Sequence, residues 1–212
     1  MKIFIPIKEI SQRVPKKNFR EFNGVPLYQY VISKYTQLRN FDVHVDTDSE
    51  EVYDWCNNNG ITPHMRNPSL IGHKVSVTDL IMNFIESNNI DDTICQVHVT
   101  SPLLDPKTII DASIYLNEGY DSIVGCDIIY NRFWENKNGK MIPINHDPKE
   151  LIQTQDLDPL YSENSSFYVF DSQTFMKTKN RIGDNPYFYE VKYPQNLDID
   201  TEEDWDLIKK FE

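Results

Sequence analysis

The sequence lacks the features that mark membrane, secreted and metal-finger proteins. No apolar run approaches the roughly 18 residues that a membrane-spanning helix requires. The opening segment MKIFIPIKEI has no small-residue cleavage site, so it does not resemble a signal peptide. The three cysteines (Cys56, Cys95 and Cys126) stand far apart without metal-type spacing, which favours reduced thiols. We therefore expect a cytoplasmic protein with no membrane partner.

Positive charge is also scarce. The 212 residues contain 21 Lys and Arg against 33 Asp and Glu, which gives a formal net charge of -12. A surface this acidic repels phosphate backbones and argues against nucleic acid as a partner. Any anionic ligand must therefore be held by a local group of basic residues. The chain also has no internal repeat and no linker, so we expect a single domain over residues 1–212.

Short apolar segments alternate with segments of helical periodicity. Strands are expected at residues 3–7, 41–45, 94–99, 122–126 and 167–170, and helices at residues 27–38, 50–58, 76–85, 106–117 and 202–211. This alternation predicts an α/β fold with a Rossmann-like, mostly parallel sheet and helices on both faces. In such sheets ligands bind beyond the carboxyl ends of the strands, so the loops at these ends are the first candidates for a site.

The alternation stops between about residues 127 and 165. Asn138-Gly139-Lys140 is typical of a hairpin turn, and the aromatic residues Tyr130, Phe133 and Trp134 lie near it. We interpret this segment as an excursion from the sheet that forms a dimerisation surface with a second copy of the chain. The alternative is a lid that packs on its own domain.

Basic residues are concentrated directly after the first strand. The loop that follows contains Lys8, Arg13, Lys16, Lys17 and Arg20. In an acidic chain this concentration favours a polyanion site, and Ser11 and the loop amides can donate further hydrogen bonds to a triphosphate. The alternative is a basic loop that only contacts solvent.

Two further segments contain candidate site residues. Asp198 and Asp200 alternate along a strand, so both carboxylates can face one point and supply the oxygen ligands that Mg²⁺ prefers. Alternatively, Asp200 or Thr201 caps the last helix. His98, Thr100 and Ser101 end a central strand, where they can line the floor of a pocket or simply form its terminal turn.

Six segments, in order along nearly the whole chain, resemble motifs of the CMP-sialic acid synthetase (acylneuraminate cytidylyltransferase) family. The family's first loop, roughly I-P-A-R-x-x-S-K-x-x-P-x-K-N and then N-G-x-P-L, appears at residues 5–18 and 23–27. Its motifs S-T-D-S-E-E-I, R-P-x-x-L, Q-P-T-S-P-L, R-Q-D-L-P-P-x-Y-x-E-N-G and I-D-I-D-T-E-E-D appear at residues 46–52, 66–70, 98–103, 154–165 and 197–204.

The resemblance implies roles for individual residues. Asp198 and Asp200 would bind a catalytic Mg²⁺, with Lys17 as a further catalytic residue. The CTP site would contain Lys8, Ser11, Gln12, Arg13, Asn18, Arg66 and Ser76. The acceptor site would contain His98, Thr100, Ser101, Thr154 and Tyr168. The implied reaction is a Mg²⁺-dependent transfer of CMP from CTP to an acidic sugar, with release of pyrophosphate, in a homodimer.

The sequence departs from the family pattern at several of these positions. Lys8 replaces an arginine and loses its bidentate fork, and Gln12 replaces a lysine, whose charge Arg13 can partly supply. His98 replaces a glutamine, and Thr154 replaces an arginine that helps to receive the sugar carboxylate. These departures leave two alternatives open: an enzyme of the same fold with another acceptor, and a non-catalytic nucleotide- or sugar-binding protein.

Overall fold

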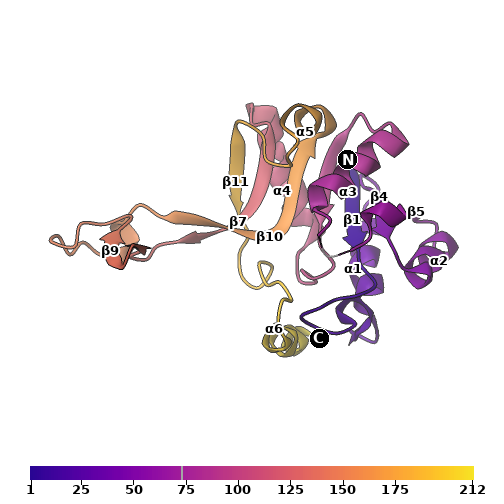
Figure 1. Ribbon diagram of the computed structural model, residues 1–212, viewed down its shortest axis with the longest axis horizontal. Coiled ribbons are helices and arrows are strands. Elements are labelled where there is room, and N and C mark those ends of the chain that lie inside the picture. The colour runs from indigo at the N-terminus through magenta and orange to yellow at the C-terminus, as the bar shows by residue number, and fades with distance from the viewer. Residues whose placement is uncertain (73) are drawn as a thin grey trace.

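The computed structural model describes residues 1–72 and 74–212. A seven-stranded sheet forms the centre, in the order β11-β7-β10-β6-β1-β4-β5 (Figure 1). Its strands are β1 (Lys2–Ile7), β4 (Asp42–Thr47), β5 (Thr62–Met65), β6 (Thr93–Val97), β7 (Ser122–Ile129), β10 (Leu160–Asp171) and β11 (Pro186–Glu190). All neighbouring pairs are parallel except those of β10, which runs antiparallel to β6 and to β7. The predicted fold, a mostly parallel Rossmann-like sheet, is therefore confirmed.

Helices cover both faces of this sheet. They are α1 (Leu27–Thr36), α2 (Glu50–Asn58), α3 (Val77–Asn88), α4 (Pro106–Ser113), α5 (Ser172–Thr178) and α6 (Glu202–Ile208). Side chains of β1 alternate between the two faces: Ile3, Ile5 and Ile7 pack in the core with α1, α2, α4 and α6, whereas Phe4 packs with α3 and α5. The alternation follows from the two-residue period of a strand. It explains why β1 is apolar throughout.

Shorter elements complete the chain. A hairpin joins β2 (Glu21–Phe22) to β3 (Val25–Pro26), and 3₁₀ helices lie at Lys17–Phe19, Pro68–Leu70, Ile114–Glu118, Thr154–Asp156 and Lys209–Phe211. The turn between β2 and β3 contains Asn23 and Gly24, both with positive φ, as is usual for an Asn-Gly pair. Among the described helices, none has the length and apolar character needed to cross a membrane.

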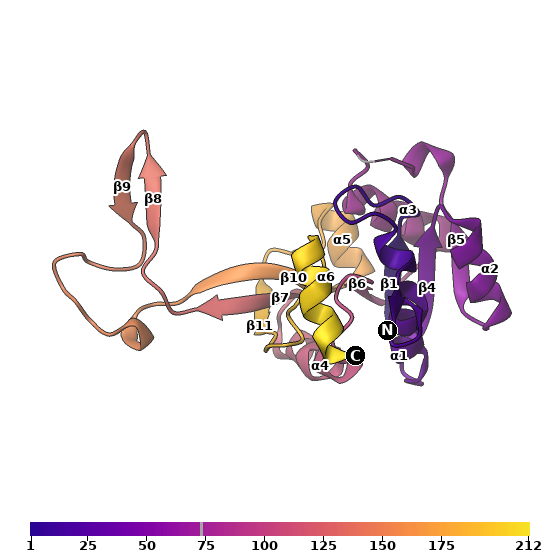
Figure 2. The ribbon, with the colours of Figure 1, turned by 90° about the horizontal axis from the view of Figure 1, so that it is seen from below.

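A long arm projects from one end of the sheet (Figures 1 and 2). Its stem is formed by β7 and β10, which pair from Ile129–Leu160 to Cys126–Glu163. Farther out, β8 (Trp134–Lys137) and β9 (Lys140–Pro143) form the predicted hairpin, with the positive-φ pair Asn138-Gly139 at its turn. The two ends of the expected excursion, residues 127–165, thus belong to the paired strands of the stem.

Several element boundaries also differ from the prediction. The strand expected to reach residue 99 ends at Val97, and the helix expected over residues 106–117 becomes 3₁₀ after Ser113. The edge strands β5 and β11 and the helix α5 were not predicted. Their sequences, such as TPHM in β5, contain little alternation, and each edge strand pairs with only one neighbour. For β5 and β11, pairing with the one neighbouring strand thus determines the extended conformation.

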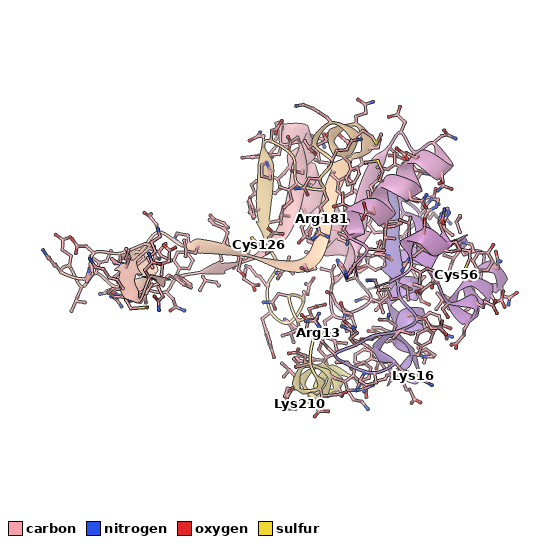
Figure 3. The ribbon with its side chains drawn as sticks, viewed as in Figure 1. Arg13, Lys16, Cys56, Cys126, Arg181 and Lys210 are labelled. Atoms are coloured by element: carbon pink, nitrogen blue, oxygen red, sulfur yellow. The ribbon has the colours of Figure 1, made fainter. Side chains whose placement is uncertain are left out.

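The three cysteines are buried and free. Cys56 lies on α2 and Cys126 on β7, at opposite sides of the domain (Figure 3).

Candidate active site

A cavity of about 410 Å³ opens at the carboxyl ends of β1 and β6. Its size falls within the range of about 300–1,000 Å³ that is usual for small-molecule sites. One wall is apolar and consists of Ile10, Val75, Val77 and Leu80. The polar lining consists of Lys8, Ser11, Gln12, Arg13, Lys17, Asn18, His98 and Thr100. The cavity therefore joins the first loop (residues 8–20) to the segment after β6, as the sheet topology predicted.

Lys17 is the most deeply buried cation of the cavity, with a relative exposure of 8%. Its ammonium group donates to the backbone oxygen of Ile199 and lies 3.8 Å from Asp200 Oδ1. Burial lowers the pKa of Lys17, while the nearby Asp198 and Asp200 carboxylates oppose this change. The first loop and the 198–200 segment thus meet at one charged group.

The other basic residues of the first loop divide into two groups. Arg13 forms an ion pair of 2.6 Å with Asp200, and its side chain remains largely exposed. Arg20, in contrast, makes a two-pronged ion pair with Glu202 of α6, at 2.6 and 2.7 Å. In Figure 3, Arg13 lies between α6 and the sheet. Lys8, Arg13 and Lys17 therefore line the cavity, whereas Arg20 connects the loop to the last helix through its ion pair.

The strand expected at Asp198 and Asp200 is not formed, because residues 197–200 have no regular secondary structure. The two aspartates lie on either side of the fully buried Ile199, whose amide donates to Thr100 O at 2.9 Å. This contact places the segment beside the residues that follow β6. Ser101 Oγ donates to Asp198 Oδ1 at 3.2 Å. The cap of α6 is Thr201, which forms a capping box with Asp204, so helix capping does not use the Asp200 carboxylate. The expectation that Asp200 or Thr201 caps the last helix is therefore confirmed for Thr201, and this cap leaves the Asp200 carboxylate available to a metal.

The donor set of this segment fits a magnesium ion. It consists of two carboxylates, which are hard oxygen ligands, and the second oxygen of Asp198 has no partner among the described residues. Within residues 1–72 and 74–212, no group of three or more His, Cys, Asp or Glu could hold a metal by itself. An ion at Asp198 and Asp200 would therefore take its remaining ligands from phosphate and water, as Mg²⁺ commonly does.

Arg66 does not line this cavity. Its side chain is fully buried and pairs with Asp46 through Nε at 2.6 Å and through a terminal nitrogen at 2.5 Å. That terminal nitrogen also donates to Ile7 O at 3.2 Å, directly before the first loop. Arg66 thus holds the end of β1 in place. Its remaining terminal nitrogen is buried without a hydrogen bond and lies 4.0 Å from Asp48 Oδ2.

His98 belongs to a polar chain on the face of the sheet that packs against α3. Its Nε2 lies 2.8 Å from Gln96 Nε2, and Gln96 Oε1 accepts from Arg181 at 2.7 Å. The Arg181 guanidinium stacks over the ring of Tyr168, 3.5 Å from its centroid. Tyr168 in turn donates to Glu163 at 2.8 Å. This chain connects the cavity to the loop that follows α5.

The structure brings most of the predicted site residues together. Eight of them line the cavity: Lys8, Ser11, Gln12, Arg13, Lys17, Asn18, His98 and Thr100. Ser101 contacts Asp198, and Tyr168 joins the site through Arg181. Ser76 caps α3 in a capping box with Asp79, next to the apolar wall. Thr154 lies in a 3₁₀ helix on the arm and does not line the cavity.

Sequence reasoning missed Gln96 and Arg181. Gln96 had a usable signal, because it lies two residues before His98 and so on the same face of the strand that was expected to reach residue 99. Arg181 had none: it lies in a polar loop after α5, and only the fold brings it to β6.

The fold is a Rossmann-like α/β domain with a cavity at the carboxyl ends of β1 and β6. It is similar to CMP:2-keto-3-deoxy-manno-octonic acid synthetase complexed with CTP, with a TM-score of 0.67 and 18% identity over 99% of this chain and 96% of the other. It is also similar to 4-diphosphocytidyl-2C-methyl-D-erythritol synthase, with a TM-score of 0.69 and 10% identity over 99% and 97% of the two chains. At these identities the likeness shows the fold alone.

The family model described as cytidylyltransferase matches residues 3–212, so the chain belongs to the cytidylyltransferase family. It is 29% identical to N-acylneuraminate cytidylyltransferase of Oncorhynchus mykiss, over 94% of this chain and 47% of that protein. It is 28% identical to pseudaminic acid cytidylyltransferase of Campylobacter jejuni, over 97% and 93% of the two chains. The chain spans about half the length of the first curated relatives it matches. The family resemblance of the sequence motifs is thereby confirmed, at the identities of a divergent member.

Proposed function

We propose that this protein transfers CMP from CTP to an acidic sugar of the ulosonic or nonulosonic type, with Mg²⁺, and releases pyrophosphate. The observation that carries the proposal is the meeting of Lys17 with Asp198 and Asp200 beside a cavity lined by further cations. Three cations and two carboxylates at the carboxyl edge of the sheet suit a triphosphate and its metal. Family membership and the relatives named for acidic sugars support the same reading.

In the proposed reaction, a hydroxyl oxygen of the sugar attacks the α-phosphorus of CTP. A bond forms between that oxygen and phosphorus, the bond to the β-phosphate bridge breaks, and the hydroxyl proton passes to a base. Lys8, Arg13 and Lys17 neutralise the triphosphate and hold it in line, and the apolar wall around Val75 and Leu80 packs against the nucleoside. Positioning and charge neutralisation supply most of the rate enhancement in such transfers.

Asp198 and Asp200 would hold Mg²⁺, which would supply positive charge to the phosphate oxygens. Ser101 orients Asp198 through its hydrogen bond. Arg13 pairs with Asp200 when no triphosphate is present, and a triphosphate offers the Arg13 guanidinium a stronger partner. Arg13 would then leave Asp200 to the metal.

The acceptor side favours an acidic sugar other than sialic acid itself. The arginine that the family places before Gln-Asp-Leu is Thr154 here, and it lies on the arm. Within the cavity, His98 is a candidate for a hydrogen-bonding contact to the acceptor. Candidate acceptors are octulosonic-type, legionaminic-type and pseudaminic-type acids.

We also propose that the arm mediates homodimer formation. It exposes large apolar side chains, which in a monomer would remain in contact with water: Tyr130, Trp134, Met141, Ile144, Leu151, Ile152 and Tyr161. Several exposed apolar side chains on one projecting arm are typical of a protein contact surface.

A pyrophosphate-release assay with CTP, Mg²⁺ and a panel of acidic sugars tests the function. At least one sugar should give turnover, and Asp198→Ala should reduce it by about 100-fold or more, because several kcal/mol of charge stabilisation are lost. Asp206→Ala is the matched control, since Asp206 is an exposed carboxylate of α6, and it should retain the wild-type rate. Wild-type turnover in Asp198→Ala would refute the metal assignment. CTP binding without any enhancement by Mg²⁺, measured by calorimetry, would favour the non-catalytic binding protein.

A further inference from the structure

Gln96 occupies a position in β6 where an apolar residue would be expected. It is completely buried, and the neighbouring strand positions opposite it are Phe4 of β1 and Tyr168 of β10. Such a buried amide is costly unless its oxygen and its nitrogen both find partners. Both do: Arg181 contacts the oxygen at 2.7 Å, and His98 contacts the nitrogen at 2.8 Å.

The arginine determines which way this amide points. A guanidinium group has only donors, so it must face the oxygen of the Gln96 amide. The amide nitrogen is then directed at His98 Nε2, and an amide nitrogen can only donate. His98 Nε2 must therefore accept the hydrogen bond, which means that it carries no proton. In a neutral imidazole the proton then resides on Nδ1.

We propose that Arg181 and Gln96 are positioning residues that fix His98 in the Nδ1–H tautomer, so that His98 donates a hydrogen bond to the acceptor substrate in the cavity. This proposal rests on the proposed function for the identity of the substrate, although the tautomer itself does not depend on it. The recognised group is a hydrogen-bond acceptor, such as a carboxylate or hydroxyl oxygen of the sugar. With Nδ1 protonated and Nε2 engaged, His98 does not serve as the general base.

The surroundings of His98 support a neutral ring. Burial lowers the pKa of His98 to about 4, with Asp198 and Asp200 opposing and Arg181 and Lys17 reinforcing the change. No described residue hydrogen-bonds to Nδ1, while His98 lines the cavity. The ring thus has one nitrogen engaged within the protein and one donor left for a ligand.

The loop that carries Arg181 is anchored well enough to hold this geometry. The Gly183 amide donates to Ser122 Oγ at 2.8 Å, and the amides of Asp184 and Asn185 donate to Asp121 Oδ2 at 2.8 and 2.9 Å. A Cβ atom on Gly183 would come within 2.3 Å of Asp121, so only glycine allows the loop to pack this closely. Arg181 also has no carboxylate within 4 Å among the described residues, which leaves Gln96 and Tyr168 as its contacts.

Nuclear magnetic resonance of the histidine rings tests the tautomer without any substrate. Long-range proton–nitrogen correlation on ¹⁵N-labelled protein at neutral pH should show a protonated Nδ1 and an unprotonated Nε2 for His98. The signals of His98 are identified by their loss in His98→Gln. A protonated Nε2 in the wild-type protein would overturn the proposal, whatever the variants do.

Variants of the two partners test how the tautomer is fixed. Gln96→Glu replaces the donor that faces His98 by an acceptor, so the His98 Nε2 signal should move to the range of a protonated nitrogen. The exposed Gln37→Glu is the matched control and should leave the ring signals unchanged. Arg181→Lys keeps a donor toward the amide and should preserve the tautomer, whereas Arg181→Met should produce a mixture. Unchanged His98 signals in both Gln96→Glu and Arg181→Met would contradict the proposal.

Kinetics then separates this proposal from the proposed function. Arg181→Met should raise the KM for the acceptor by about tenfold, the worth of one hydrogen bond, with little change in the KM for CTP, and Arg181→Lys should restore it. An equal rise in both KM values would contradict the assigned role toward the acceptor. If the spectra show the Nδ1–H tautomer but no sugar gives turnover, the tautomer assignment stands and the proposed function fails.

Discussion

Charged side chains of this protein have different roles according to what surrounds them. Lys17 is buried beside two carboxylates and faces a cavity, whereas Arg20, three residues later, is committed to Glu202. Both belong to the same basic loop, and composition alone does not distinguish them. Arg66 is a third case: its side chain is completely buried, and it holds the end of β1 by donating to Ile7 O.

The buried pair of Arg66 and Asp46 leads to a prediction about stability. Arg66→Met leaves the Asp46 carboxylate, which is only 4% exposed, without its counter-ion, so the free energy of unfolding should fall by about 3–5 kcal/mol. Urea denaturation measures the change. The double variant Arg66→Met/Asp46→Leu should recover part of the loss, since no unpaired charge remains.

An exposed ion pair provides the control for this experiment. Lys177 and Asp184 lie 3.0 Å apart in solvent, and Lys177→Met should leave the free energy of unfolding nearly unchanged. A loss in Arg66→Met no greater than in Lys177→Met would contradict the structural role of Arg66.

At the scale of elements, the arm is the feature that differs most from the rest of the fold. Its strands β8 and β9 pair only with each other, and they pack on no helix of the domain in either view (Figures 1 and 2). Isolated two-stranded hairpins are marginally stable in water. A second copy of the chain would bury the apolar side chains of the arm and stabilise it.

The arm therefore predicts a specific oligomeric state. The protein should sediment as a dimer at micromolar concentration, and the double variant Trp134→Glu/Leu151→Glu should sediment as a monomer, because it places charge in an apolar contact. Ile114→Glu changes a similarly exposed apolar residue of the domain body and is the control. A monomeric wild-type protein, or a double variant that still forms dimers, would refute the dimerisation surface.

At the scale of the whole molecule, two neighbouring histidines make the free energy of unfolding depend on pH. His44 and His64 lie side by side on β4 and β5, with Nδ1 and Nε2 2.9 Å apart. Burial lowers the pKa of both, that of His64 to about 4, and Asp42 and Lys2 are the charged neighbours of His44. In the unfolded chain a histidine titrates near 6.5. Below that pH the unfolded state binds protons that the folded state excludes.

The sign of the pH effect follows from this difference. The contribution of His64 to stability is complete above about pH 6.5 and is lost as the pH falls toward 4, by at most about 1.4 kcal/mol per pH unit for one proton. His64→Gln should therefore lose less stability than the wild-type protein between pH 6.5 and 4.5. Urea denaturation at several pH values measures both slopes. Equal slopes would show that His64 does not contribute.

The sequence by itself determined the fold class and much of the site. The apolar run of β1 and the regular succession of strands and helices are local patterns. Such patterns predict the elements correctly because each element buries its own apolar side chains. The first loop and Asp198-Ile199-Asp200 were also recognisable, since charge clusters and alternating carboxylates are short-range features. Eight predicted residues indeed line one cavity.

Only the tertiary structure decided which of these residues contact each other and which hydrogen bonds and ion pairs they form. It directs Lys17 to Asp200 and Arg20 to Glu202. It also assigns the cap of α6 to Thr201 instead of Asp200, and it places Thr154 on the arm. It also brings Arg181 across 85 residues of sequence to Gln96, and through it to His98. Hydrogen-bond partners of this kind depend on distance in space, and the strand order that sets such distances is a property of the folded sheet as a whole.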